Sequence, residues 1–303
     1  MRPSFTVRLR HAAGDAVLLF LLPCSIALLP WALGFRLLRR LARIPRLWRN
    51  AVEPAWNNAK PYLPNVDETE WKFEQRLLRL VDNTDSYLTL LRSDRWWTHH
   101  VDVIGEWPAS GARVFLTYHW GAGHWIWRFL RTHGFDAGFV ARRAEGRSLG
   151  MGRLSHAYAA YRGWAMRRIG SRGPLFVGAG KSALRDDLDA GASVVGMLDL
   201  PAASQQRAME LPLFGRNAVL PIGLARLAID AGSPITLFSA GFDPQTGRRL
   251  LRIESLPNES SLDDIMRRYA AHLDARLRER PAFWQIWRDA PAIFVEARVD
   301  QAL

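Results

Sequence analysis

The sequence has very little of what several protein classes depend on. Cys24 is the single cysteine among 303 residues, which excludes a disulfide-stabilised scaffold and a cysteine-rich metal site. Charged residues are also a minority at 23%, and the hydrophobic fraction of 49% excludes a disordered polyelectrolyte. The length suits one large domain or two small ones with a full hydrophobic core.

The glycine patterns that bind nucleotides are incomplete. Residues 178–182 resemble the end of a phosphate-binding loop, but Leu175 occupies the position of the glycine that should begin it. Residues 121–123 follow a predicted strand and open a helix, yet Ile126 stands where a dinucleotide site needs its third glycine. The Gly-x-Ser-x-Gly turn of serine hydrolases is absent.

Positive charge is present but unevenly distributed. The net charge is +12, and ten basic against two acidic residues give +8 to positions 1–60. The other 243 residues therefore carry only +4. A nearly neutral body without a nucleic-acid-binding motif argues against nucleic acid as a partner. The charge pattern favours attachment of the N-terminal segment to an anionic membrane surface.

A run of 20 residues without charge, positions 16–35, lies inside this basic segment. Its length roughly matches what a helix needs to cross the hydrocarbon core. Pro23 and Pro30 interrupt the run, so a kinked span and a shallow re-entrant hairpin are alternatives. The long run, the six arginines that follow it and the lack of a clear cleavage site disfavour a signal peptide; a helix of a soluble core is the remaining alternative. We expect an N-terminal membrane-anchoring helix that is retained.

The arginine count also predicts an orientation. Three arginines precede the uncharged run and six follow it, which favours a body on the cytoplasmic side. We therefore divide the chain into a membrane anchor with a basic juxtamembrane segment, residues 1–60, and a second domain, residues 61–303.

From about residue 101 onward, segments with strand patterns alternate with segments of helical periodicity. The expected strands are 101–105, 114–117, 138–141, 175–177, 193–198, 235–238 and 250–253. The expected helices are 71–91, 125–130, 154–166, 182–188, 220–231 and 264–277. This alternation predicts an α/β fold with a largely parallel central sheet flanked by helices.

The segment 118–124 carries the clearest chemical signal. His119 follows a buried strand, and Gly121 and Gly123 permit a tight turn before the next helix. Active sites of α/β proteins collect at the carboxyl ends of such strands. A neutral imidazole at this position is able to take a proton near neutral pH.

These features, in this order, resemble the late acyltransferases of lipid A biosynthesis, within the glycerophospholipid and lysophospholipid acyltransferase superfamily. His119 and Gly121 match that family's first motif, a histidine followed after four residues by an aspartate or glutamate. Further family elements are matched in order by 139–142, which ends in arginine, 197–199, which ends in Asp199, 211–215 and, loosely, 281–287. The resemblance extends over nearly the whole chain.

The resemblance implies an acyltransferase that moves a fatty acyl group from a thioester to a lipid. The donor would be an acyl carrier protein or coenzyme A. His119 would act as general base, and backbone N–H groups around Gly121 and Gly123 would stabilise the oxyanion. The reaction implies no metal and no redox cofactor.

The same resemblance suggests how the acceptor is bound and where the protein acts. Arg142, or the adjacent Arg143, would bind a phosphate of the acceptor, and Phe214 and Gly215 would shape the acceptor cleft. The expected location is the bacterial inner (cytoplasmic) membrane, with the catalytic domain on its cytoplasmic side. The acceptor would be a lipid A precursor, another glycolipid, or a specialised lipid such as an aryl-polyene-type lipid or an aminolipid.

One position departs from the family pattern. His124 stands where the motif acid belongs, and a neutral histidine is able to fix a tautomer but supplies no negative charge. Asp199 could orient His119 instead, or the acceptor could be more acidic or more nucleophilic than a sugar hydroxyl. In the third alternative catalysis is lost, and the protein is a membrane-anchored relative that binds lipid or carrier protein.

Overall fold

The computed structural model describes residues 13–142, 152–177, 181–202 and 207–295. Within these residues the central sheet has seven strands in the order β1-β9-β8-β2-β5-β3-β4. A smaller sheet has the order β10-β7-β6. The strands are β1 (Val101–Ile104), β2 (Val114–Thr117), β3 (Ala137–Arg142), β4 (Ser171–Val177), β5 (Ser193–Met197), β6 (Ala208–Leu213), β7 (Arg216–Pro221), β8 (Ile235–Phe242), β9 (Arg249–Ser255) and β10 (Phe294–Val295).

The central sheet is largely parallel. Strands β8 and β9 pair antiparallel, whereas the other neighbouring pairs of this sheet are parallel. Strand β2 lies in the middle and is buried along its whole length, as its run of apolar residues predicts. The predicted fold class is therefore confirmed, and β2 and β5 lie side by side with their carboxyl ends at one edge.

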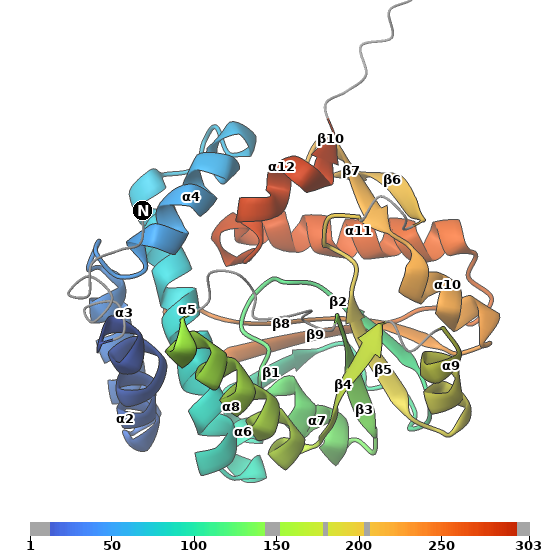
Figure 1. Cartoon of the computed structure of the whole chain (residues 1–303), viewed down its shortest axis with the longest axis horizontal. Coiled ribbons are helices and arrows are strands. Elements are labelled where there is room, and N and C mark those ends of the chain that lie inside the picture. Colours follow the sequence, from blue (N-terminus) through green and yellow to red (C-terminus); the bar gives the residue numbers. More distant parts are fainter. Residues whose placement is uncertain (1–12, 143–151, 178–180, 203–206, 296–303) are drawn as a thin grey trace, which may run out of the picture.

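Helices cover both sides of this sheet. In Figure 1, α11 runs above the sheet, while α6 and α7 lie below it and α5 stands at its left. The α-helices are α2 (Leu22–Leu28), α3 (Trp31–Ala42), α4 (Arg49–Ala59), α5 (Glu68–Leu91), α6 (Asp94–His100), α7 (Ile126–Thr132), α8 (Arg153–Ile169), α9 (Lys181–Asp189), α10 (Gly223–Asp230), α11 (Leu262–Glu279) and α12 (Ala290–Ile293). Shorter helical turns are η1 (Val17–Leu21), η2 (Lys60–Tyr62), η3 (Pro281–Phe283) and η4 (Trp287–Asp289).

The uncharged N-terminal run, residues 16–35, contains η1, α2 and the beginning of α3, and Leu29 and Pro30 separate α2 from α3. Leu29, which precedes the proline, is extended at φ −76° and ψ 159° and ends α2. In the part of the chain that the structure describes, no helix combines the length and the apolar character that a membrane crossing needs. The predicted membrane-anchoring helix is therefore not found among these residues.

One face of α2 and α3 is buried against the rest of the molecule. Ile26, Phe35 and Leu38 are 4%, 3% and 0% exposed, and the two helices pack on α5. The indole N–H of Trp31 donates to the carbonyl of Gly247 at 3.1 Å, which ties α3 to the turn between β8 and β9. Helices on both sides of position 60 thus contribute to one hydrophobic core.

A fully buried ion pair lies beside this attachment. Arg249 of β9 pairs with Asp85 of α5, and both side chains are 0% exposed. The Arg249 guanidinium also stacks on Trp31, 3.9 Å from the ring centroid, and donates to the carbonyl of Gly247 at 2.8 Å. Burial raises the pKa of Asp85 to about 6, although the charge of Arg249 opposes this shift.

The segment before α10 differs from the sequence-based prediction. A helix is expected over 220–231, but α10 begins at Gly223, and the preceding residues form the hairpin of β6 and β7. Phe214 and Gly215 make its two-residue turn with φ of +54° and +73°. This turn needs positive φ at both positions, which asparagine and glycine usually supply, so a phenylalanine conceals the hairpin in the sequence.

Candidate active site

The loop that follows β2 is held by backbone contacts from distant parts of the chain. The amide of His119 donates to Asp199 Oδ2 at 2.8 Å, and its carbonyl accepts from the amide of Gln285 at 2.7 Å. Gly121 has φ +81°, and a Cβ there would lie 2.1 Å from the carbonyl oxygen of Ala240. The turn that presents His119 therefore requires glycine at position 121.

His119 and Asp199 form a hydrogen-bonded pair. His119 Nδ1 lies 2.9 Å from Asp199 Oδ1; the carboxylate is 0% exposed and the imidazole side chain 29% exposed. An ionised carboxylate only accepts hydrogen bonds, so Nδ1 carries the proton and Nε2 keeps its lone pair. His119 and Asp199 lie close together because β2 and β5 are parallel neighbours, so the residues that follow their carboxyl ends lie at the same edge of the sheet.

Residues from the C-terminal half hold Asp199 in place. The indole N–H of Trp284 donates to Asp199 Oδ2 at 2.8 Å. The hydroxyl of Tyr269 accepts from the amide of Leu198 at 3.1 Å and donates to the carbonyl of Thr117 at 2.9 Å, so it joins the ends of β5 and β2. The carboxylate thus accepts from His119 and Trp284 without contact with solvent.

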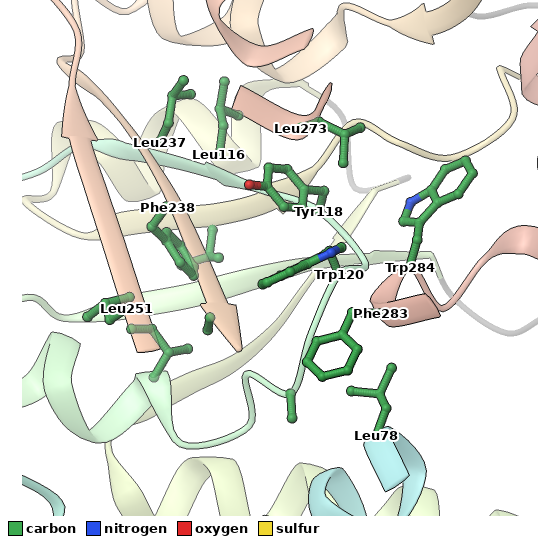
Figure 2. Close-up of a cluster of buried hydrophobic side chains, with 14 of the residues drawn as sticks. Leu78, Leu116, Tyr118, Trp120, Leu237, Phe238, Leu251, Leu273, Phe283 and Trp284 are labelled. Atoms are coloured by element: carbon green, nitrogen blue, oxygen red, sulfur yellow. The ribbon is translucent and has the colours of Figure 1, made fainter. Parts of the chain in front are cut away.

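A cluster of aromatic side chains supports this arrangement. Figure 2 shows Trp120 beside Phe283 and Trp284, with Tyr118 on the side of Leu273. Trp120 and Phe283 have ring centroids 5.5 Å apart, and Trp120 forms an isolated antiparallel bridge with Trp284. These contacts anchor the C-terminal segment directly behind the His119 loop.

The balance of burial and charge determines the proton affinity of His119. Burial is the largest influence and lowers the pKa of His119, but the negative charge and hydrogen bond of Asp199 oppose it. Their sum, with a smaller contribution from Asp289, raises the pKa of His119 above its ordinary value. Asp199 therefore stabilises the protonated imidazole that forms when His119 accepts a proton.

His119 opens onto a cavity of about 870 Å³. This volume is within the range of small-molecule binding sites. Its wall is mainly apolar and comes from the sheet and from α7, α8, α9 and α10. The apolar side chains include Ile126, Trp127, Phe139, Val140, Met166, Leu184, Val195, Met197, Leu198, Leu224, Leu227 and Phe238. A cavity with this lining suits a hydrocarbon chain.

The glycines of the loop lie where the sequence places them, with one correction. Gly121 and Gly123 both line the cavity. The amide of Gly121, however, donates to the carbonyl of Phe283 at 2.9 Å, and its own carbonyl accepts from the Gln285 side chain at 2.6 Å. The Gly121 N–H is therefore not available to an oxyanion, because the C-terminal segment already occupies it.

His124 does not take the place of the motif acid beside His119. It is 4% exposed, and its Nε2 lies 3.4 Å from the carbonyl oxygen of Arg162 in α8. The Nδ1 atom of His119, which the motif acid would orient, bonds to Asp199 instead. The prediction of His124 as an orienting group is therefore wrong, since its side chain is directed to α8.

Of the predicted acceptor-binding residues, the two in the β6–β7 turn do not line the cavity, and the structure does not describe the side chains of the two arginines. Arg142 ends β3 and its side chain is not described, while Arg143 lies outside the described residues. Phe214 and Gly215 form the β6–β7 turn, where the Phe214 amide donates to Asp274 Oδ1 at 2.5 Å, and neither lines the cavity. The β6–β7 turn lies against α11, because this hydrogen bond and the packing of β6 on α11 hold it in that position.

Several site residues were not identified from the sequence. Trp284 and Gln285 belong to segment 281–287, whose similarity to a family motif was the available signal. Tyr269 lies in α11 at helical spacing with other buried residues, so nothing in the sequence marks it. Cationic side chains on the cavity wall come from Arg162, Arg207 and Arg226.

The comparisons with known proteins differ in what they find. No known family profile matches the sequence, and no curated protein matches it. Among solved structures, the chain is similar to the crystal structure of the 1-acyl-sn-glycerophosphate (LPA) acyltransferase PlsC from Thermotoga maritima. The sequence identity is 14% and the TM-score is 0.38, with 84% of this chain and 97% of that chain covered. These values assign no family, so the functional argument depends on the site itself.

Proposed function

We propose that this protein is an acyltransferase that moves a fatty acyl group from a thioester of acyl carrier protein or coenzyme A to a lipid acceptor. One observation carries the proposal. His119, with its Nδ1 proton held by the buried Asp199, borders a largely apolar cavity of about 870 Å³. A positioned base beside a site for a hydrocarbon chain is what acyl transfer to a hydroxyl or amine requires.

The reaction follows from the state of the imidazole. Nε2 of His119 takes the proton from the acceptor O–H or N–H, and the resulting nucleophile attacks the thioester carbonyl. The tetrahedral intermediate then collapses, the new ester or amide bond remains, and the C–S bond breaks. The imidazolium, stabilised by Asp199, returns its proton to the departing thiolate. His119 is regenerated in its neutral form.

Positive charge at the cavity suits an anionic part of a substrate. Arg207 and Arg226 both line the cavity, and Arg226 also pairs with Asp230 at 3.1 Å. We assign to these arginines the binding of a phosphate, which is present in the carrier thioesters and in phospholipid acceptors. Recognition by Arg142 or Arg143 stays a prediction beside this assignment.

The proposed activity is tested by direct transfer. Purified full-length protein is incubated with a radiolabelled acyl thioester and with separate candidate acceptors, namely a lysophospholipid, a glycolipid and an aminolipid. A new labelled lipid with one of them supports the proposal. Thioester binding without transfer to any acceptor would instead favour the second candidate, a relative that binds lipid or carrier protein without catalysis. The departure from the family motif at His124 is the sequence feature that suggests this candidate.

We also propose that the N-terminal helices attach the protein to the cytoplasmic face of the bacterial inner membrane. Leu21, Leu28 and Leu33 are 63%, 66% and 48% exposed along this segment. Exposed arginines on and after α3 include Arg36, Arg40 and Arg43. Exposed leucines next to arginines match the apolar and anionic layers of a bilayer surface.

Replacing Arg36, Arg40 and Arg43 together by glutamine is expected to weaken binding to vesicles that contain anionic lipid by roughly 100-fold. Each arginine near such a surface contributes about 1 kcal/mol. Vesicle co-sedimentation at low and high salt measures the effect. A matched control replaces Arg267, Arg268 and Arg278 of α11 together by glutamine, which removes three exposed charges elsewhere on the protein. Equal losses in both proteins would contradict a surface formed by the N-terminal helices.

A further inference from the structure

Acyl transfer needs a hydrogen-bond donor beside the thioester carbonyl. When the nucleophile attacks, the carbonyl oxygen becomes an oxyanion, and a donor fixed beside it lowers the energy of that state. The amide of Gly121 does not serve, because it already donates to the carbonyl of Phe283 at 2.9 Å. Side chains that lie against the His119 loop are another source of donors.

Gln285 lies directly against this loop. Trp120 and Trp284 form an antiparallel bridge, so Gln285 stands opposite His119, and its backbone amide donates to the His119 carbonyl at 2.7 Å. Gln285 is exposed and lines the same cavity as His119. The bridge therefore brings an uncharged polar side chain to the cavity wall next to the base.

The orientation of the Gln285 carboxamide follows from its partner. Its Nε2 lies 2.6 Å from the carbonyl oxygen of Gly121. A carbonyl oxygen only accepts, so the atom that faces it is the amide nitrogen and not the amide oxygen. Nε2 carries two N–H groups, and Gly121 is its one hydrogen-bond partner among the described residues. Gln285 thus holds a second N–H free for a substrate, on an amide that is already fixed.

We propose that this second N–H donates to the thioester carbonyl oxygen as it becomes an oxyanion, so that Gln285 is a catalytic residue of acyl transfer. The inference rests on the proposed acyltransferase function. On attack the π electrons of the carbonyl move onto oxygen, and on collapse they restore the double bond while the C–S bond breaks. Gln285 transfers no proton. Its hydrogen bond strengthens while the oxygen is negatively charged, and the bond to Gly121 spares the amide any reorganisation.

The experiment compares wild type, Gln285→Met and Gln285→Lys, each as full-length protein, in single-turnover transfer of a radiolabelled acyl thioester to the acceptor that wild type uses. Methionine has a similar length but no N–H, so the rate should fall by about 10²–10³-fold. Thioester affinity should change by less than about threefold, because the interaction forms only in the transition state. Lysine retains N–H donors, and this variant should be at least about 10-fold faster than the methionine variant.

The pH dependence separates this role from a structural one. A residue that merely held the loop would, when replaced, disturb the pair of His119 and Asp199 and move the pH at which the rate rises. Loss of an oxyanion donor lowers the rate by the same factor at every pH and leaves that rise in place. Gln245→Met is the matched control, because Gln245 is exposed in the turn between β8 and β9 and does not line the cavity. It should transfer at the wild-type rate.

Thermal unfolding reports whether each variant is folded. Transfer by Gln285→Met at the wild-type rate, a rise that moves to another pH, or a lysine variant no faster than the methionine variant would each overturn the inference and leave the proposed function intact. Absence of transfer by wild type to every acceptor would contradict the proposed function, and the inference with it.

Discussion

Replacing His119 by alanine is expected to lower the rate of acyl transfer by about 10²–10⁴-fold, the usual contribution of a positioned general base. Without the imidazole nothing at this position takes the proton from the acceptor. Thioester binding should persist, because the apolar cavity wall is unchanged. Single-turnover assays with the radiolabelled thioester separate the two effects, since the label remains bound but is not transferred.

The variant should remain folded. The His119 side chain is 29% exposed, and its backbone amide and carbonyl, which bond to Asp199 and Gln285, are retained. His156→Ala is a suitable control, because His156 is an exposed histidine on α8 that does not line the cavity. Equal rates of transfer by His119→Ala and wild type would contradict the assignment of His119 as general base and the mechanism that depends on it.

Asp199→Asn is expected to reduce transfer by about 10⁴-fold, the cost of losing the orienting carboxylate in a catalytic triad. Asparagine has the shape of aspartate, but its amide no longer forces the proton onto Nδ1 and supplies no charge to stabilise the imidazolium. The loss should appear mainly in the catalytic rate and less in thioester affinity. Rapid-quench measurement of a single turnover provides this rate.

The pH profile distinguishes this role from a structural one. In wild type the rate rises with pH until His119 is neutral, and Asp199 places that point above the ordinary histidine pKa. Without the carboxylate, burial outweighs the smaller effect of Asp289 and lowers the pKa of His119, so the rise should move to lower pH. Asp289→Asn removes a more distant charge and should change the rate by less than about fivefold. A rise that stays at the same pH in Asp199→Asn would contradict the assigned pairing.

Some of the strands near the site can be predicted from their local sequence pattern, and others cannot. The run 114–117 is short and apolar except for Thr117, and the structure places β2 at these residues. The largely apolar segment 193–198 likewise predicts β5 and places Asp199 after it, because a buried strand of a parallel sheet has apolar residues on both faces. Strand β6 contains Pro212, and its turn uses a phenylalanine at positive φ, so neither strand of that hairpin was predicted.

The uncharged N-terminal run shows that composition alone does not identify a membrane-spanning helix. Twenty uncharged residues satisfy the length criterion for a membrane helix, but that criterion ignores what the segment packs against. In the structure Pro30 divides the run, and Phe35 and Leu38 are buried beside α5. An apolar stripe buried in a protein core and one buried in lipid have similar sequences, because both are removed from water.

The sequence by itself determined the alternation of strands and helices, the position of His119 at a strand end, and the concentration of positive charge near the N-terminus. These features follow from local periodicity and composition, which short segments contain in full. Only the tertiary structure decided that Asp199 pairs with His119, that Trp284 holds this carboxylate, and that His124 faces α8. These contacts join residues between 38 and 85 positions apart, and the order of strands in the sheet sets which of them meet. That order results from burial of the whole chain, which no local pattern specifies.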